Sequence, residues 1–431
     1  MKIASSAPAS TPGSAPGTDQ MGPREFVVLM AMSMALQALA IDAMLPALAG
    51  IAEELAITDP NQRQLIVGVF LLASGLGALI PGSLADRYGR RPVLLGSLAL
   101  YIVLSLGCAL VTDFTTLLVL RAAQALGSAG LTVLPSAIIR DRHGGDAMAR
   151  QMSTITVIFM MVPMVAPSIG LAVLMVAGWR WIFGLLALMG LVVGLWVGLR
   201  LEETLDPANR QPIRPGAIAS NMITAASDRS SFGYVVGGGL ILGALFGYVN
   251  CAQQLVGEHF GAGDTFPLIF GATALCMAFA SFFNSRIVER FGARRVSHTA
   301  VLVSLALSAL QVWLASRSSE TLIEFMPVIA LNICMVGFIG ANFSSIALQP
   351  FAHMAGAASS VQAFLRMVIG SGLGMIIGLA YDGTALPLAL AFLGCGLGGL
   401  LLVLWSEHGK LFRRINPRGT LREVPLPDTH C

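Results

Sequence analysis

Two twelve-residue segments, GSLADRYGRRPV at residues 82–93 and SRIVERFGARRV at residues 285–296, repeat one pattern of charge and glycine. An acidic residue, an arginine, a glycine and a second arginine keep the same spacing in both segments. Each segment directly follows a long apolar stretch. A repeat in this parallel sense predicts two related halves with the same orientation in space.

The composition around these segments is that of a membrane protein. The chain is 55% hydrophobic and 11% charged, whereas an ordinary soluble domain is about 25% charged. A helix that crosses a bilayer needs about 20 mostly apolar residues. Stretches of this kind lie at 26–48, 64–84, 92–111, 115–139, 152–174, 181–199, 232–256, 266–286, 296–315, 323–348, 355–379 and 385–405. We therefore predict an all-α membrane protein with twelve transmembrane helices in two six-helix bundles.

The polar segments between these stretches set the expected domain boundaries. Residues 1–22 are rich in Ala, Ser, Pro and Gly and lack the features of a signal peptide, which predicts a disordered tail. Residues 23–200 and 232–406 would form the two bundles. The proline-containing stretch at 201–231 would link them, and residues 407–431 would form a second tail.

The basic residues predict the orientation, because Lys and Arg are retained on the cytoplasmic side of a membrane. With the N-terminus inside, only Arg63, Arg180 and Arg317 of the 26 basic residues fall outside, and Arg121 and Arg366 fall within spans. We therefore expect a multi-pass protein of the bacterial inner membrane with both termini in the cytoplasm. The net charge of +3 is spread over short clusters, which argues against a nucleic-acid partner.

The first repeat, GSLADRYGRRP from Gly82 to Pro92, fills every key position of the pattern G-x-L-a-D-R-x-G-R-[RK]. In this it resembles the signature loop of the major facilitator superfamily. The two glycines would permit close helix packing and a tight turn, and the charges would bond to neighbouring helix ends. We expect a conformational latch formed by Gly82, Asp86, Arg87, Gly89, Arg90 and Arg91. For Arg90 or Arg91 taken singly, a role in topology alone explains the residue equally well.

Four further segments resemble the bicyclomycin and chloramphenicol resistance group of drug/proton antiporters. They are AIDAMLPAL at 40–48, LRAAQALGSAG at 120–130, GWRWIF at 178–183 and QPFAHMAGAASS at 349–360. The resemblance covers nearly the whole membrane region. It implies the major facilitator fold and export of small, partly apolar drugs in exchange for protons by alternating access.

Asp42 and Arg121 are the predicted proton-coupling residues. Asp42 is the only carboxylate deep within an apolar stretch, where an ionisable group is costly and usually functional. It lies six residues before the predicted span end at Leu48, or about 9 Å at a 1.5 Å rise, in the outer third of the span. Arg121 lies at a similar depth in the fourth span, so the two would face each other. The resemblance implies that this pair couples protons to substrate, whereas structural hydrogen bonds by either residue are the alternative.

The fifth span contains the sequence MVPMVAPSIG, in which Pro163, Pro167 and Gly170 predict a loosened or kinked helix. It matches the antiporter signature G-P-x-x-G-G only in part, because Ala166 and Leu171 replace two glycines. A kink that serves packing alone is the alternative.

Other polar residues within the spans are candidates for a substrate cavity. Arg366 lies near the expected midplane of the eleventh span, where it would pair with an anionic substrate or with Asp42, or else bond to backbone carbonyls or to Gln362. The remaining candidates are Gln37, Gln124, Tyr248, Asn250, Gln253, Asn332, Asn342 and Gln362. Polar residues of this kind within spans more often form hydrogen bonds between helices than contacts with a ligand.

Motifs for enzymatic or ATP-driven chemistry are missing from the sequence. No phosphate-binding GxxxxGK[ST], HExxH-type metal spacing or plausible soluble catalytic set occurs, and the six cysteines lack CxxC spacing. We expect no enzyme activity, no metal and no cofactor, with a proton gradient as the driving force. The expected partners are a small-molecule substrate, protons and the lipid bilayer, with the chain as a monomer. A metabolite or siderophore transporter of either direction and a non-transporting membrane receptor are the alternatives.

Overall fold

The structure is a computed structural model that describes residues 21–142, 145–210, 216, 228–317 and 319–412. The described part is built of helices, because in lipid a helix satisfies all its backbone hydrogen bonds internally. The longer helices are α1 (Pro23–Asp42), α2 (Leu48–Glu54), α3 (Leu65–Gly77), α4 (Leu79–Tyr88), α5 (Arg90–Ala109), α6 (Phe114–Arg142), α7 (Gly145–Val176), α8 (Arg180–Arg200), α10 (Arg229–Gln253), α11 (Phe266–Phe291), α12 (Ala293–Ala315), α13 (Leu322–Leu348), α14 (Ala355–Leu379) and α15 (Leu386–Ser406).

The prediction of twelve spans is confirmed, with one span broken. Among the described residues, 11 helices are long and apolar enough to cross a membrane. The twelfth is the pair Pro60–Gly77 and Leu79–Tyr88, bent by 42° at the break. Pro81 follows this break and lacks the N–H that a continuous helix would need.

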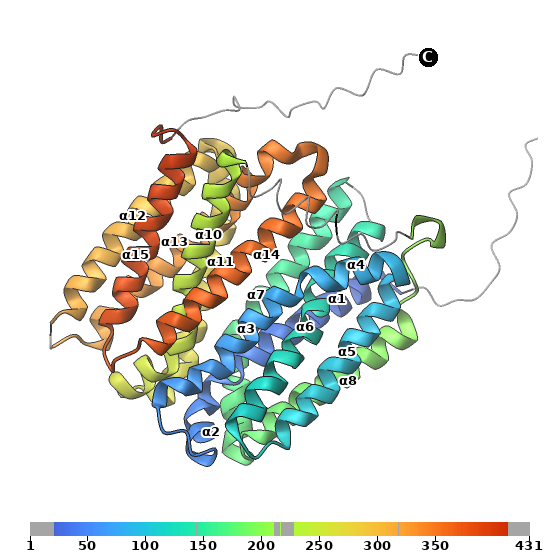
Figure 1. The fold of residues 1–431 in the computed structure, drawn as a ribbon, viewed down its shortest axis with the longest axis horizontal. Helices are drawn as coiled ribbons and strands as arrows, with labels where there is room; N and C mark the ends of the chain where they lie inside the picture. Colours follow the sequence, from blue (N-terminus) through green and yellow to red (C-terminus); the bar gives the residue numbers. More distant parts are fainter. Residues whose placement is uncertain (1–20, 143–144, 211–215, 217–227, 318, 413–431) are drawn as a thin grey trace, which may run out of the picture.

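The helices form two groups that lie side by side (Figure 1). In one group, α5 packs on α6 and α8, and α1 packs on α7. In the other, α10 packs on α14 and α15, and α12 packs on α13. The groups meet where α3 contacts α14 and where α7 contacts α11. The end of the molecule where α1 begins and α15 finishes is called the basic end below, and the other is called the opposite end.

The predicted tails and linker lie largely outside the described residues. Residues 1–20, 217–227 and 413–431 are not described. The helix α10 begins at Arg229, three residues before the predicted start of the second bundle. The cause is Asp228, whose side chain accepts a hydrogen bond from the backbone N–H of Ser231 at 2.9 Å and so caps the helix.

The first span is not one continuous helix. The helix α1 finishes at Asp42, a 3₁₀ turn follows at Leu45–Ala47, and α2 continues to Glu54. Pro46 in this turn has no N–H to donate, which stops the regular helix. The prediction that Asp42 lies about 9 Å from the outer end is therefore wrong. The span continues past Leu48, and Asp42 lies about 18 Å along the helical path from Glu54.

The contact between α10 and α14 is a reciprocal glycine zipper, in which each helix places glycines four residues apart against large residues of the other. On α10 the glycines are Gly239, Gly243 and Gly247, against Ile369, Leu373 and Ile377. On α14 they are Gly370, Gly374 and Gly378, against Leu242, Phe246 and Asn250. A Cβ atom built at Gly243 would lie 2.8 Å from a methyl of Leu373. Small residues of this kind let helix backbones approach closely in a membrane.

The two sequence repeats have the same local structure. The backbone turns at Gly89 with φ 107° and ψ 156°, and at Gly292 with φ 86° and ψ 147°. Positive φ values of this kind favour glycine. Each turn joins the end of one helix to the start of the next, so the aligned glycines mark equivalent corners of the two groups.

Candidate functional site

Asp42 lies at the break of the first span and is buried. Its exposure is 6%, and none of the ion pairs among the described residues involves it. The following backbone, at Ala43, packs against Gly170 of α7, where any side chain would collide with the Ala43 carbonyl. A buried carboxyl group is thus placed where one helix is interrupted and another approaches it closely.

Arg121 of α6 is fully buried and binds polar atoms of three helices. Its Nε donates to the carbonyl of Ile66 at 3.2 Å, one Nη donates to the carbonyl of Ala40 at 3.1 Å, and the other donates to Oε1 of Gln124 at 2.7 Å. The guanidinium also lies over the ring of Phe70, with 4.2 Å between its central carbon and the ring centroid. Arg121 therefore joins α6 to α1 and α3 through backbone carbonyls.

The predicted face-to-face pair of Asp42 and Arg121 is not an ion pair in this state. Within the described residues, Arg121 reaches the first span at Ala40, two positions before Asp42. The guanidinium of Arg121 nevertheless binds the part of the span in which Asp42 lies. A small movement of α1 or α6 would change the distance between the two charges.

The fifth span remains a single helix, α7, with Pro163 and Pro167 inside it. Ala166 and Pro167 are buried, whereas Pro163 is partly exposed. The predicted kink remains a prediction. Gly170 has a defined packing role, because it allows α7 to touch the broken part of the first span.

The loop from Gly82 to Pro92 forms bonds within its own group of helices. Arg90 bridges two acids, with Nη1 at 2.5 Å from Asp86 and Nε at 2.9 Å from Asp141. The carboxylate of Glu203 accepts hydrogen bonds from the backbone N–H groups of Arg90 at 2.8 Å and Arg91 at 3.2 Å. An anion in this position stabilises the N-terminus of α5.

The other residues of this loop have separate contacts. Arg91 donates to the carbonyl of Gly198 at 2.6 Å. The guanidinium of Arg87 lies over the ring of its neighbour Tyr88 at 5.3 Å, and Gly82 packs near Val133 of α6. The loop thus connects α4, α5, α6 and the segment after α8. Glu203 and Asp141 were missed by sequence reasoning, because they lie far from the loop in the chain.

Most of the polar residues predicted to line a cavity bind neighbouring helices. Asn332 donates to Ser308 at 2.8 Å, and Asn342 donates to Asn284 at 2.8 Å. Gln124 donates to Ser105 at 2.6 Å, Tyr248 lies 3.4 Å from the hydroxyl of Thr273, and Gln362 donates to the carbonyl of Ala347 at 2.9 Å. These contacts agree with the alternative of hydrogen bonds between helices.

Three of these candidates retain polar atoms that have no partner among the described residues. The amide of Gln37 donates to Ser74 but its Oε1 is unpaired. Both side-chain polar atoms of Asn250 are unpaired, as is Oε1 of Gln253. A buried polar atom without a partner is costly, so these amides are the ones available to a ligand.

Arg366 follows the structural alternative in part. Its Nη1 donates to the hydroxyl of Ser344 and, at 3.4 Å, to the carbonyl of Gly340. Both acceptors belong to α13, so Arg366 joins α14 to α13. Within the described part of the chain, Arg366 forms no hydrogen bond or ion pair with Asp42 or Gln362, its predicted partners.

A cluster at the opposite end, called the seam cluster, joins the two groups of helices. Arg63 forms an ion pair with Glu258 at 2.6 Å. The amide of Gln64 contacts the amide of Gln254, and Asn61 donates to the carbonyls of Leu379 at 3.2 Å and Tyr381 at 2.6 Å. Sequence reasoning missed this cluster, although Arg63 as one of three outer arginines was a signal.

The comparison with protein families agrees with this fold. The model of the Major Facilitator Superfamily matches residues 30–378. The chain belongs to the major facilitator superfamily. Members of this superfamily are transporters, so the protein is a multi-pass membrane transporter.

Relatives within the superfamily cover most of the chain. An uncharacterized MFS-type transporter, YdgK of Bacillus subtilis, is 32% identical over 86% of this chain and 93% of its own. A bicyclomycin resistance protein homolog of Haemophilus influenzae is 29% identical over 86% of this chain and 93% of its own. A chloramphenicol resistance protein of Pseudomonas aeruginosa is 29% identical over 84% and 86%.

Solved structures show the same major facilitator fold. A bacterial homolog of the lysosomal transporter Spinster, in an inward-facing and unoccupied conformation, matches with a TM-score of 0.66 at 17% identity, over 92% of this chain and 97% of its own. The peptide transporter POT in complex with sulfate matches with a TM-score of 0.70 at 15% identity, over 89% and 93%.

Proposed function

We propose that this transporter exports small, partly apolar toxic compounds across the bacterial inner membrane in exchange for protons. The named relatives with resistance functions support the substrate class. The substrate would bind between the two groups of helices, which would open in turn to either side of the membrane. The proton gradient would supply the energy.

The observation that carries this proposal is the position of Asp42. It is a buried carboxyl group in a membrane span, and no basic side chain among the described residues forms an ion pair with it. An unpaired charge is costly in such surroundings, so binding of a proton there relieves a large penalty. Arg121 of α6 donates to the carbonyl of Ala40, which lies in α1 two residues before Asp42. Movement of α1 against α6 would therefore change the distance from Asp42 to this positive charge, and with it the affinity of Asp42 for a proton.

The orientation follows from the charges at the two ends. We place the basic end in the cytoplasm, because basic residues are retained on that side. Arg63, Arg180 and Arg317 at the opposite end each pair with a glutamate, namely Glu258, Glu54 and Glu324. This pairing neutralises the positive charges that would face the outside. With the seam cluster closed, the described state would be open toward the cytoplasm.

Substitution of Asp42 by Asn tests the proposal. The amide cannot exchange a proton, so Asp42→Asn should abolish substrate-induced proton release from everted vesicles while insertion and folding persist. The substrate would be chosen from a panel led by chloramphenicol and bicyclomycin, screened in a strain that expresses the wild-type chain. Glu53→Gln is the matched control, because Glu53 is an exposed carboxylate of the same span. Unchanged proton release in Asp42→Asn would refute the proposed role.

A second test concerns the loop around Asp86, which we propose acts as a latch. The Asp86 side chain is 49% exposed in its pair with Arg90, so its loss should change stability by no more than about 1 kcal/mol. Asp86→Asn should therefore slow exchange between states, measured as a several-fold lower transport rate, and leave equilibrium substrate binding intact. Normal turnover in this variant, or equal losses of binding and rate, would contradict a latch.

A further inference from the structure

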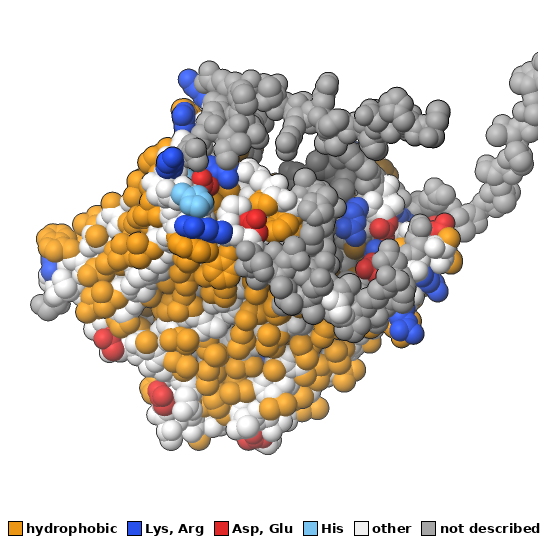
Figure 2. Space-filling model, turned by 45° about the horizontal axis from the view of Figure 1, so that its top comes forward, with side chains coloured by type: hydrophobic (Ala, Val, Ile, Leu, Met, Phe, Trp, Pro, Cys, Tyr) orange, Lys and Arg blue, Asp and Glu red, His pale blue; other side chains and the backbone are white. Residues whose placement is uncertain are grey.

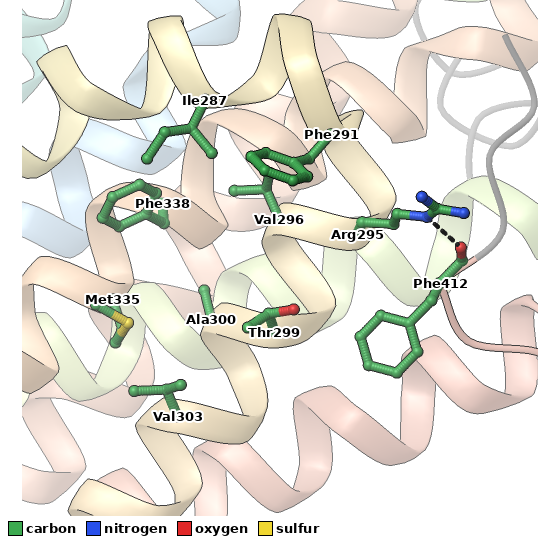
Figure 3. A pocket seen from close by; sticks show the side chains of 10 residues that line it. All are labelled: Ile287, Phe291, Arg295, Val296, Thr299, Ala300, Val303, Met335, Phe338 and Phe412. Carbon is green, nitrogen blue, oxygen red and sulfur yellow. Dashed lines mark hydrogen bonds between the residues drawn. The ribbon is translucent and has the colours of Figure 1, made fainter. Parts of the chain in front are cut away.

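An apolar groove opens on the second group of helices, outside the contact between the two groups. It has a volume of about 620 Å³. Figure 3 shows its walls, formed by α11 and α12, with α13 behind them. The lining residues are Ile287, Phe291, Arg295, Val296, Thr299, Ala300, Val303, Met335, Phe338 and Phe412.

The groove exists because α11 and α12 diverge from a tight turn. They are joined at Gly292, and each packs more extensively on α13 than on the other. The gap between them is therefore closed by the turn at the basic end, and α13 forms its floor. Val296, Ala300 and Val303 are three or four positions apart on α12, so they lie on one face of the helix and form an apolar wall of this gap.

The length and the apolar lining of the groove suit part of a lipid acyl chain. It extends along α12 from Arg295 to Val303, which is about 12 Å of helix. Phe291 and Val303 in its walls are 46% and 41% exposed. Val303 lies within the span Ala293–Ala315, where an exposed apolar residue faces acyl chains. The hydroxyl of Thr299 is the one side-chain polar group among its uncharged lining residues.

The charge at the mouth of the groove is positive. Arg295 is exposed, and its Nε donates to the carbonyl of Phe412 at 3.1 Å, as Figure 3 shows. The terminal nitrogens of this guanidinium have no acceptor among the described residues. Arg286 and Arg290 are also exposed, and each immediately precedes a lining residue of α11.

Two acidic residues, Glu407 and Glu289, lie near the mouth of the groove in the sequence. Glu407 accepts from Arg294 at 2.6 Å and from Tyr234 at 2.8 Å. The side chain of Glu289 lies outside the described part. Figure 2 shows Lys and Arg side chains gathered at the basic end, above a broad hydrophobic band. By formal charge, four arginines, Arg286, Arg290, Arg294 and Arg295, outnumber the two acids Glu289 and Glu407, so an anion at this level would meet an excess of positive charge.

We propose that this groove binds an anionic phospholipid, with an acyl chain between α11 and α12 and the phosphate at Arg295. Arginine binds phosphate through charge-assisted hydrogen bonds, and basic pockets on the cytoplasmic side of membrane helices bind anionic headgroups. The transported compound is a poorer occupant, because this groove does not lie between the two groups of helices. The lipid would fill the gap between α11 and α12 and stabilise the second group.

Native mass spectrometry of the purified full chain tests this proposal. The chain would be placed in mixed micelles containing equal amounts of dioleoylphosphatidylglycerol and dioleoylphosphatidylcholine. We expect bound phosphatidylglycerol to exceed phosphatidylcholine in the wild type. Arg295→Gln should reduce the phosphatidylglycerol adducts about fivefold, because one basic contact is lost. Arg295→Lys should retain most of them.

Two tryptophan variants on α12 separate the groove from the general lipid surface. Thr299→Trp fills the groove and should remove both lipids, whereas Leu302→Trp adds the same side chain at an exposed position outside the lining and should have no effect. Arg317→Gln at the opposite end is the charge control. Size-exclusion chromatography would verify folding of each variant.

Three results would overturn the proposal. The first is equal binding of the two lipids by the wild type, and the second is an unchanged preference in Arg295→Gln. The third is an increase in lipid adducts after removal of residues 413–431, which would show that the chain's own tail occupies the groove. Adducts lost in Thr299→Trp and kept in Leu302→Trp would support it.

Discussion

Arg121 makes contacts that a lysine cannot reproduce. Its planar guanidinium donates in three directions, to two backbone carbonyls and to Gln124, whereas an ammonium is a compact point charge. A lysine there would leave at least one buried acceptor unpaired, at a cost of about 1–3 kcal/mol. The residue therefore fixes α6 relative to α1 and α3, whatever its part in proton coupling.

We predict that Arg121→Lys lowers transport at least about tenfold and also lowers the thermal unfolding midpoint of the purified protein. The loss follows from the hydrogen bonds to Ile66, Ala40 and Gln124 that a lysine does not reproduce together, and from the displaced first span. Transport in everted vesicles and thermal unfolding in detergent would measure the two effects. Arg142→Lys is a control, because that arginine lies on the last turn of the same helix. Wild-type transport and stability in Arg121→Lys would show that the charge alone suffices.

The sequence identified Asp42 and Arg121 because ionisable side chains stand out in apolar stretches. Their contacts could not be predicted, since the carbonyls that Arg121 binds belong to Ala40 and Ile66 of other helices. Backbone acceptors carry no sequence signature. For the same reason the bond of Arg366 to the Gly340 carbonyl was only one of several alternatives.

At the scale of elements, the zipper of α10 and α14 leaves no room for side chains at its glycines. A Cβ at Gly374 would lie 2.5 Å from the Cβ of Phe246 and 2.9 Å from its carbonyl carbon. The backbone of α10 cannot move away without opening the whole contact. By contrast, Gly372 of the same helix has no atom within 4 Å of an added Cβ.

We predict that Gly374→Ala destabilises the protein and that Gly372→Ala does not. Overpacking of this kind typically costs about 1–3 kcal/mol, and alanine otherwise favours a helix by up to about 1 kcal/mol over glycine. Thermal unfolding of the two purified variants in the same detergent would compare them. Equal midpoints for the pair would mean that α10 and α14 are not packed as closely as described.

Apolar run lengths predicted the number of helices well but not their interruptions. The run that starts at residue 26 contains Pro46, and the structure breaks there into α1, a 3₁₀ turn and α2. Length alone placed the span end at Leu48, because the polar residues Glu53 and Glu54 lie beyond it. Beside the break, α7 approaches the Ala43 carbonyl at Gly170, and this tertiary contact is not encoded in run length.

At the scale of the whole molecule, the seam cluster holds the two groups of helices together at the opposite end. Its ion pair joins Arg63, whose side chain is 6% exposed, to Glu258, whose side chain is 47% exposed. A pair of this kind contributes about 0.5–1 kcal/mol. This is enough to shift the balance between two conformations several-fold.

We predict that Arg63→Glu or Glu258→Arg opens the opposite end and that the charge-exchanged double variant closes it again. Spin labels at Glu53→Cys and Asp264→Cys, in a background without native cysteines, would report the distance between the groups by electron–electron double resonance. Each single variant should raise the population of the longer distance about two- to fivefold. Arg317→Glu is the control, because its partner Glu324 belongs to the same group. A double variant that stays open would exclude a direct ionic contact.

The repeat at 82–93 and 285–296 predicted two related halves, and the turns at Gly89 and Gly292 have the same backbone geometry. The contacts between the two groups could not be predicted from this repeat. The contacts of Arg63 with Glu258 and of Gln64 with Gln254 join residues about 190 positions apart. No local pattern encodes such a pairing.

The glycine zipper also has a consequence for how the chain is made. More than a hundred residues separate Gly243 from its neighbour Leu373, so the ribosome needs about 6 to 26 seconds between them at about 5–20 residues per second. Until α14 emerges, the zipper glycines Gly239, Gly243 and Gly247 lack the α14 residues that pack against them in the folded protein. During this interval that face of a nascent α10 would lie against lipid or other helices in place of its final neighbour.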